Sequence, residues 1–211
     1  MRTMIGIPTM GEVPVRFMAS LLAMKRVGSV EFEMTDHSLI YDARNRIAKL
    51  AIDEGFDRVL WLDSDMVFGP ELMEKLSRWI DCGCEMVSGL YFKRKPPPEP
   101  VIYQDCCLRK DEEGKPVPSA VVYRDFPENR IFEVAGCGFG AVMTTVQLLK
   151  DVYDSFGLPF SPAGGLGEDL SFCARVAELG RKMWCDSSIQ LGHIGKMIYT
   201  REDWDGWMSM R

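Results

Sequence analysis

Apolar residues over the first ninety positions fall into short runs that alternate with segments of helical spacing. The runs, among them VLWL at 59–62, predict buried strands, and the spaced segments predict amphipathic helices. The predicted strands span 3–7, 30–34, 58–62 and 86–90, and the predicted helices span 14–26, 42–54 and 71–81. Strands separated by helices of this length favour an α/β fold with a mainly parallel sheet.

The pattern changes after residue 92. Three consecutive prolines exclude a helix or central strand from the segment 93–100. Short strand-like pieces between 101 and 134, separated by polar turns, predict an antiparallel edge or flap added to the sheet. Helical spacing returns around 145–155 and over 170–179, and a further strand is predicted at 183–185.

Charge and cysteine content narrow the class of protein. The chain has 211 residues and a net charge of −6, so we predict no nucleic-acid partner, because such binders usually present a basic face. Seven cysteines, an odd number without a CxxC pair, indicate free thiols in a reducing compartment. No apolar run approaches the ~20 residues that span a bilayer. We therefore expect no membrane span and a cytoplasmic location.

Two acidic residues follow the buried strand directly, in Asp63-Ser64-Asp65. They are predicted at the edge where open α/β sheets bind ligands. In extended backbone, residues i and i+2 project to one side, so both carboxylates should point the same way and need a compensating cation. Carboxylate oxygens suit Mg²⁺ or Mn²⁺, which also bind diphosphate oxygens. The alternative is a solvated turn whose acids cap the helix after Pro70.

A second acidic pair, Glu168 and Asp169, precedes the helix predicted at 170–179. One interpretation is a helix N-cap, where an acid is stabilised by the helix dipole. The preceding segment SPAGGLG favours another, because glycines let backbone close over a ligand and set a carboxylate beside an acceptor hydroxyl. The sequence leaves capping and catalysis open, and one acid can do both.

His193 is one of two histidines and lies in LGHIG, a predicted strand end flanked by glycines. A lone histidine is more often a hydrogen-bonded structural residue than a ligand. An imidazole nevertheless suits Mn²⁺, and the glycines would let backbone approach a diphosphate. His37 has no comparable context, and we expect it to be structural.

Six segments in this order resemble a family 2-type glycosyltransferase of the GT-A fold, in its short bacterial or phage form. They are IPTMGE near the start, ARN, VLWLDSDM, GCGFGAVM, GEDLSFC and GHIG. The resemblance implies a Rossmann-like, mixed but mainly parallel sheet flanked by helices, with a small antiparallel flap. It also implies one domain over 1–211, with a nucleotide-binding half (1–92), an acceptor, flap and catalytic half (93–193) and a C-terminal tail (194–211).

The same resemblance implies how substrate is bound. Pro8, Thr9 and Glu12, at the exit of the first strand, would hold the base and ribose of a UDP- or GDP-linked sugar. Arg44 would contact a phosphate or sugar, or else be an exposed helical arginine. The remaining implied substrate-binding residues are Asp63 and Ser64 and, lining the donor-sugar or acceptor pocket, Gly136, Cys137 and Gly138.

A divalent ion, Mn²⁺ or Mg²⁺, would be held by Asp65 directly, by Asp63 (which binds the ion or the ribose) and by His193. Asp169 would be the base that deprotonates the acceptor hydroxyl, with Glu168 the alternate candidate. The implied function is metal-dependent transfer of a sugar from a nucleotide-sugar donor to a hydroxyl acceptor, with inversion. The alternatives are a sugar-nucleotidyltransferase and a nucleotide- or sugar-binding module without turnover.

Three further features of the sequence each have more than one interpretation. The basic turn Lys93-Arg94-Lys95 is either solvated or contacts phosphate or an anionic acceptor. The tail with Trp204 and Trp207 covers the site, forms a dimer contact or caps the core. Either the segment 157–167 or the segment after His193 is expected to close over the bound donor.

Overall fold

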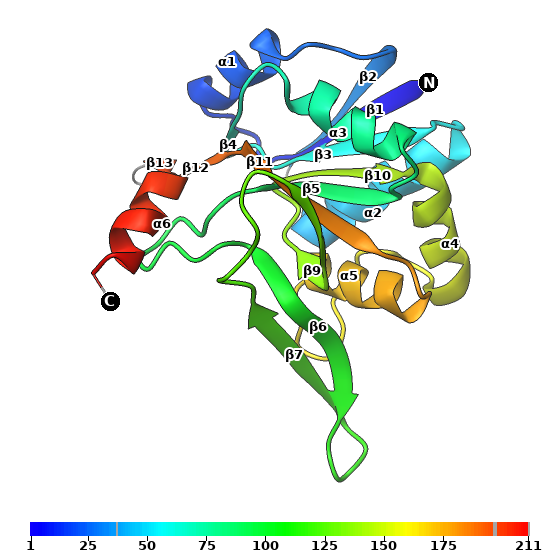
Figure 1. Ribbon diagram of the computed structural model, residues 1–211. Coiled ribbons are helices and arrows are strands. Elements are labelled where there is room, and N and C mark those ends of the chain that lie inside the picture. The colour runs from blue at the N-terminus through cyan, green and yellow to red at the C-terminus, as the bar shows by residue number, and fades with distance from the viewer. Residues whose placement is uncertain (37, 196–197, 211) are drawn as a thin grey trace.

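A computed structural model of the chain describes residues 1–36, 38–195 and 198–210 and has a mixed seven-stranded sheet at its centre (Figure 1). The strand order is β2-β1-β3-β10-β5-β11-β8. Two strands, β10 and β8, run antiparallel to their neighbours, and the other pairings are parallel, so the sheet is mixed and mainly parallel as expected. The strands are β1 (Arg2–Pro8), β2 (Ser29–Thr35), β3 (Arg58–Leu62), β5 (Met86–Leu90), β8 (Ile131–Val134), β10 (Ala141–Thr145) and β11 (Met183–Gln190).

Helices cover both faces of this sheet (Figure 1). On one face lie α1 (Val15–Ala23) and α3 (Leu72–Asp81), and on the other lie α2 (Ile40–Asp53), α4 (Val146–Phe156) and α5 (Glu168–Glu178). Strand β3 serves both cores, because alternate side chains of a strand point to opposite faces. Leu60 and Leu62 pack with α1 and α3, whereas Val59 and Trp61 pack with α2, α4 and α5.

The main strand that the sequence analysis did not predict is β10, which lies between β3 and β5. It passes directly into α4, and Thr145 is both its last residue and the N-cap of the helix, with Oγ1 accepting a hydrogen bond from Leu148 N at 3.2 Å. The sequence pattern predicts the helix around 145–155 and assigns no element to residues 141–144, and no turn residue marks the boundary between strand and helix. Strands β3 and β5 have their predicted bounds.

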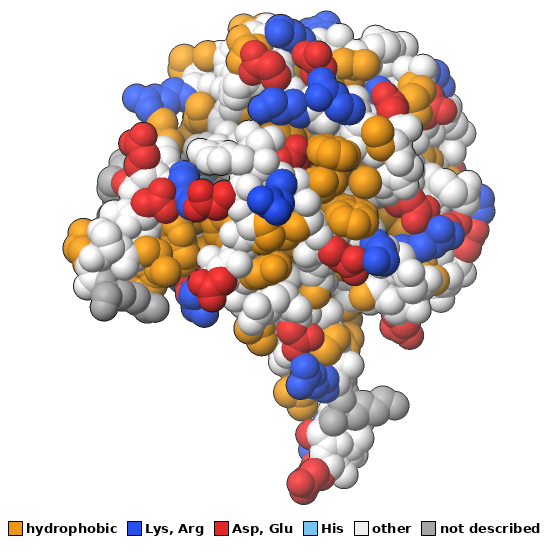
Figure 2. All heavy atoms as spheres, viewed as in Figure 1, with side chains coloured by type: hydrophobic (Ala, Val, Ile, Leu, Met, Phe, Trp, Pro, Cys, Tyr) orange, Lys and Arg blue, Asp and Glu red, His pale blue; other side chains and the backbone are white. Residues whose placement is uncertain are grey.

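The expected antiparallel additions are present as a hairpin and a sheet edge. Strands β6 (Ile102–Lys110) and β7 (Pro116–Val122) form a hairpin that projects from the body of the molecule (Figures 1 and 2). A two-residue strand, β9 (Gly136–Cys137), pairs with the base of β6. The strand-like piece at the end of this region, β8, is not part of the hairpin and pairs with β11 at the edge of the main sheet.

The C-terminal part forms a small sheet and a last helix. Strand β12 (Gly192–Ile194) lies between β4 (Met66–Val67) and β13 (Ile198–Tyr199), and α6 (Arg201–Met208) follows. Trp204 is buried and stacks on Phe92 with ring centroids 5.8 Å apart, and Trp207 packs on Trp204. The tail therefore caps the core. His37 and part of the segment after His193 lie outside the described residues, and no described helix combines the length and hydropathy that a bilayer span requires.

Because β3 is buried, we predict that truncating one of its side chains destabilises the protein. Leu60 is fully buried, whereas Leu108 on the hairpin is 39% exposed. Leu60→Ala should lower the free energy of unfolding by about 2–5 kcal/mol, because it leaves a cavity between sheet and helices. Leu108→Ala, the matched control, should change it by less than about 1 kcal/mol. Urea denaturation of both variants measures the difference, and equal losses would contradict this assignment of the core.

Candidate functional site

The Asp63-Ser64-Asp65 segment lies where β3 ends, at the carboxyl edge of the sheet. The strand stops at Leu62, Asp63 N donates to Gly140 O, and Met66 N donates to Asp63 O at 3.2 Å, which closes a turn. The backbone therefore turns here instead of continuing extended as expected, so the alternation of side chains along a strand does not decide where the two carboxylates point. Asp63 and Asp65 instead have different partners.

Asp65 meets His193 because of the small C-terminal sheet. Strand β4 follows the turn directly and pairs antiparallel with β12, which sets His193 opposite Met66. Ile194 N donates to Asp65 O at 2.7 Å and fixes the two segments together. Asp65 Oδ2 lies 3.3 Å from His193 Nε2. Two segments that are far apart in sequence thus bring a carboxylate and an imidazole into contact.

A backbone carbonyl fixes the orientation of the His193 imidazole. Its Nδ1 is 2.8 Å from Phe92 O, so the N–H on Nδ1 donates to that carbonyl and Nε2 faces Asp65. Tyr91 packs edge-on against the ring, with centroids 5.5 Å apart. Burial alone would lower the pKa of His193, but the hydrogen bond and charge of Asp65 outweigh it and raise that pKa. This arrangement, with one nitrogen held by a carbonyl, is typical of metal-binding histidines.

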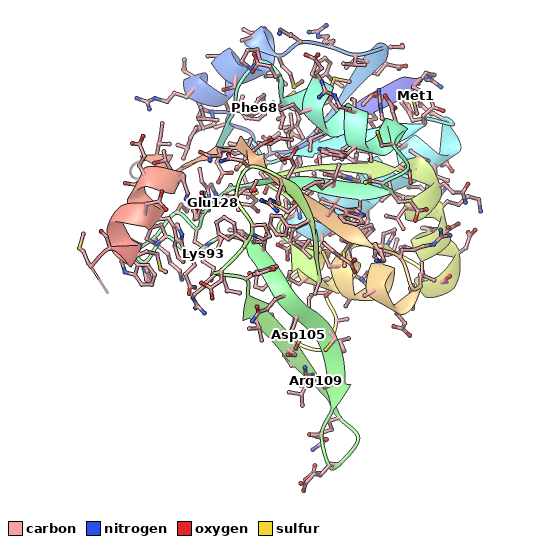
Figure 3. All side chains as sticks on the ribbon, viewed as in Figure 1. Met1, Phe68, Lys93, Asp105, Arg109 and Glu128 are labelled. Carbon is pink, nitrogen blue, oxygen red and sulfur yellow. The ribbon has the colours of Figure 1, made fainter. Side chains whose placement is uncertain are left out.

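A third group, Arg94, contacts the same carboxylate. Arg94 Nη1 lies 2.5 Å from Asp65 Oδ2, the oxygen that also faces His193. Burial would raise the pKa of Asp65, yet the His193 hydrogen bond and the charges of His193 and Arg94 hold it below its usual value. Arg94 belongs to the segment between β5 and β6, and Lys93 beside it lies on the side of the molecule where α6 packs (Figure 3).

Asp63 is held by Arg44 of α2. The guanidinium donates to Asp63 Oδ1 at 2.7 Å and to Glu168 Oε1 at 2.9 Å, and it lies over the ring of Phe139. Arg44 is 2% exposed, so the interpretation as an exposed helical arginine is wrong. Burial raises the pKa of Asp63 despite the opposing effect of Arg44. Arg44 thus joins the first acid of one motif to the first acid of the other.

The pair Glu168 and Asp169 stands in the first turn of α5. The N-cap is Gly167, and no side chain caps this end of the helix, so the acids are not N-cap residues. Asp169 Oδ1 accepts from Leu170 N at 2.7 Å. Burial raises the pKa of Asp169 to about 6; Arg44 opposes this shift and the charge of Glu168 adds to it. A carboxyl group with such a pKa exchanges its proton near neutral pH, as a general base must.

A cavity of about 550 Å³ opens beside Asp63 and Asp65, and neither Glu168 nor Asp169 is among the residues that line it. Its walls come from the exit of β1, the loop before α2, the turn after β3 and the basic turn that holds Arg94. The predicted site residues among its lining are Pro8, Thr9, Glu12, Asp63, Ser64 and Asp65. The volume falls within the range usual for small-molecule sites.

The glycine-rich segment at 136–138 lies outside that lining. Cys137 is buried, with its N–H 3.5 Å from Cys173 Sγ. A Cβ on Gly138 would lie 2.1 Å from Tyr91 Oη, and one on Gly136 would lie 2.9 Å from the Cβ of Cys106. Close packing explains why glycine is needed at both positions, and their expected role in lining a pocket stays a prediction.

The segment 157–167 is tied to the body by several hydrogen bonds. Phe160 N donates to Asn45 Oδ1 at 2.8 Å, and Arg175 donates to the carbonyls of Pro159 and Ser161. Ser171 Oγ accepts from Ala163 N. These contacts hold the loop against α2 and α5 in the structure described here.

The metal site expected at Asp63, Asp65 and His193 is assembled in part. Asp65 and His193 converge, whereas Asp63 is engaged by Arg44. Over residues 1–36, 38–195 and 198–210, no group of three or more His, Cys, Asp or Glu side chains is arranged to hold an ion. An oxygen and an imidazole nitrogen facing each other beside a cavity nevertheless fit Mn²⁺ or Mg²⁺, whose other positions water and phosphate oxygens can fill.

Sequence reasoning left one residue of this site undecided and missed another. Arg94 was placed in a turn with two interpretations, and the contact with Asp65 supports a role beyond solvation. Tyr91 gave no signal, because an apolar strand end is its ordinary context; its hydroxyl accepts a hydrogen bond from Gly140 N, and burial raises its pKa well above the usual value. Only the spatial contact with His193 reveals it.

Comparison with known proteins supports the fold. No family model matches the chain, and no curated protein matches it. Among solved structures, A197 from STIV is similar with a TM-score of 0.63 and 19% identity, over 92% of this chain and 86% of that one. GalNAc-T7, solved with UDP, GalNAc and Mn²⁺, is similar with a TM-score of 0.58 and 10% identity, over 93% of this chain.

The chain spans 44% of the length of the GalNAc-T7 chain, so it corresponds to less than half of that protein. At these identities the likeness concerns the fold alone. Neither match points to glycosyltransferase family 2 in particular. The two matches, together with the mixed sheet and its flanking helices, show that the chain has a GT-A-like fold.

Proposed function

We propose that the protein is a metal-dependent glycosyltransferase of the family 2 type, which transfers a sugar from a UDP- or GDP-linked donor to a hydroxyl acceptor with inversion. The observation that carries the proposal is the convergence of Asp65 Oδ2 and His193 Nε2 at 3.3 Å beside the cavity at the end of β3. The likeness to GalNAc-T7, whose structure holds UDP, GalNAc and Mn²⁺, supports the choice of ligands.

Asp65 and His193 are the residues that would hold Mn²⁺ or Mg²⁺, with Asp63 adjacent. A bound divalent ion supplies a Lewis acid that stabilises the negative charge on a departing nucleoside diphosphate. The protein's own contribution is orientation: Phe92 O holds Nδ1 of His193, and Ile194 N holds the backbone of Asp65. Both ligands are therefore fixed before any ion binds.

The cavity would take the nucleotide. Pro8, Thr9 and Glu12 form its wall at the exit of β1, and Ser64 lies between the two acids. Thr9 Oγ1 accepts a hydrogen bond from Gly11 N at 2.8 Å, which closes a tight turn at the exit of β1. A donor whose base and ribose occupy the β1 side of the cavity would have its diphosphate near Asp65.

Asp169 would act as the general base. Glu168 Oε1 is held by Arg44, whereas Asp169 accepts one backbone hydrogen bond and has a pKa near 6. In the transfer, the acceptor oxygen forms a bond to the anomeric carbon and its proton goes to Asp169. The bond from that carbon to the phosphate oxygen breaks, and the nucleoside diphosphate leaves with the electron pair. Attack from the opposite face inverts the anomeric configuration.

Metal-enhanced nucleotide binding tests the site. Calorimetry should show that Mn²⁺ tightens UDP or GDP binding to the wild type by at least about tenfold, through one shared ion. Asp65→Ala should abolish that enhancement. Asp105→Ala, on the projecting hairpin (Figure 3) and outside the cavity lining, should preserve it. An enhancement that survives in Asp65→Ala, or is absent from the wild type, rejects the proposal.

The base is tested separately from binding. Asp169→Asn should lower the rate of donor turnover by about 10²–10⁴-fold, because the amide cannot accept the proton. Nucleotide affinity should be unchanged. Glu178→Gln at the other end of α5 is the matched control. Binding without turnover in the wild type would instead indicate a binding module, and pyrophosphate release from a nucleoside triphosphate and a sugar phosphate would indicate a nucleotidyltransferase.

The raised pKa of Asp169 predicts a pH profile. A base works only when deprotonated, so kcat/KM should be level above about pH 7 and should fall about tenfold per unit below about pH 6. The profile is measured by release of nucleoside diphosphate, with circular dichroism to confirm folding at each pH. A level profile down to about pH 5 would show that another group removes the proton.

A further inference from the structure

The contact between Arg94 and Asp65 puts a cationic side chain at the position that the proposed metal ion requires. Arg94 Nη1 and His193 Nε2 both face Oδ2 of Asp65, at 2.5 and 3.3 Å. The guanidinium of Arg94 carries positive charge beside this oxygen, so it repels a divalent ion that binds the same carboxylate, and each cation weakens binding of the other. Arg94 and a metal ion therefore compete for Asp65.

Arg94 is built to change partner. Its backbone lies in a segment whose base is fixed, since Lys93 N donates to Glu99 O at 2.8 Å and the Lys93 side chain pairs with Glu99 at 3.0 Å. Its own side chain is 58% exposed. An exposed guanidinium on an anchored backbone can swing to a new anion without unfolding the loop.

Arg94 also lines the cavity proposed for the nucleotide. A guanidinium presents several planar N–H donors that match phosphate oxygens in pairs. Among the residues that line this cavity, the other charged side chains are the carboxylates of Glu12, Asp63 and Asp65. A diphosphate entering the cavity thus meets Arg94 as the cation at its wall.

The inference that follows rests on the proposed function. We propose that Arg94 neutralises Asp65 while no metal ion is bound, and that it binds the donor's diphosphate when Asp65 binds the ion. Arg94 then weakens binding of the ion alone and strengthens binding of the ion and the nucleotide together. Arg94 therefore makes binding of the metal ion and binding of the donor cooperative, so that the two ligands occupy the acidic site together.

The coupling predicts effects of opposite sign in one variant. Arg94→Ala should bind Mn²⁺ alone about fivefold tighter, the size expected from losing one exposed competing ion pair. With Mn²⁺ saturating, the same variant should bind UDP or GDP about tenfold more weakly, the size of one charged hydrogen bond to phosphate. Electron paramagnetic resonance of free Mn²⁺ measures the first affinity, and calorimetry measures the second.

Two further variants separate this contact from general electrostatics. Lys95→Ala removes the same charge from an exposed neighbour outside the cavity lining, and both affinities should stay at wild-type values. Arg94→Lys keeps the charge but loses the paired donors, so nucleotide affinity should fall between those of the wild type and Arg94→Ala. Circular dichroism confirms that each variant is folded.

The outcomes separate this inference from the proposed function. If the wild type shows no Mn²⁺-dependent binding of UDP or GDP, the proposed function fails and the role of Arg94 fails with it. If the wild type shows it and Arg94→Ala matches the wild type in either titration, the proposed function stands and the coupling is overturned. Weaker binding of Mn²⁺ alone in Arg94→Ala also overturns it, because Arg94 would then support the ion.

Discussion

Two carboxylates that follow one buried strand each need a cation to offset their charge, and in this protein they pair with different cations. Asp63 pairs with the buried Arg44, whereas Asp65 meets His193 and Arg94, and both acids line the cavity. Asp63 thus ties the end of β3 to α2, whereas the cations that Asp65 meets come from the segment after β5 and from β12.

Arg44, the buried partner of Asp63, also contacts the second acidic motif, Glu168-Asp169. Arg44 holds Asp63 on one side and Glu168 on the other, with Phe139 beneath it. A buried ion pair of this kind is costly to break, because removing one partner leaves a desolvated charge. With Glu168 engaged, Asp169 is the acid left to exchange a proton, and burial gives it a pKa of about 6. On the face shown in Figure 2, acidic and basic side chains are interspersed.

Much of the fold could be predicted from the sequence, because β3 and β5 are continuous apolar runs and α2 and α3 have clear spacing. Strand β10 could not, since Thr145 ends the strand and begins the helix without a turn. At the site, the acids and His193 were found by pattern, but their partners were not. The pairing of β4 with β12 brings His193 to Asp65, and Arg94 and Tyr91 reach these two residues from the segment after β5; such long-range contacts leave no local signal.

The most direct test of this account is the anomalous scattering of manganese in a crystal grown with Mn²⁺ and UDP. The account predicts a peak between Asp65 Oδ2 and His193 Nε2, with the guanidinium of Arg94 on the diphosphate. A crystal in which manganese binds elsewhere, while Asp65 keeps its pairing with Arg94 and the nucleotide is bound, would contradict it.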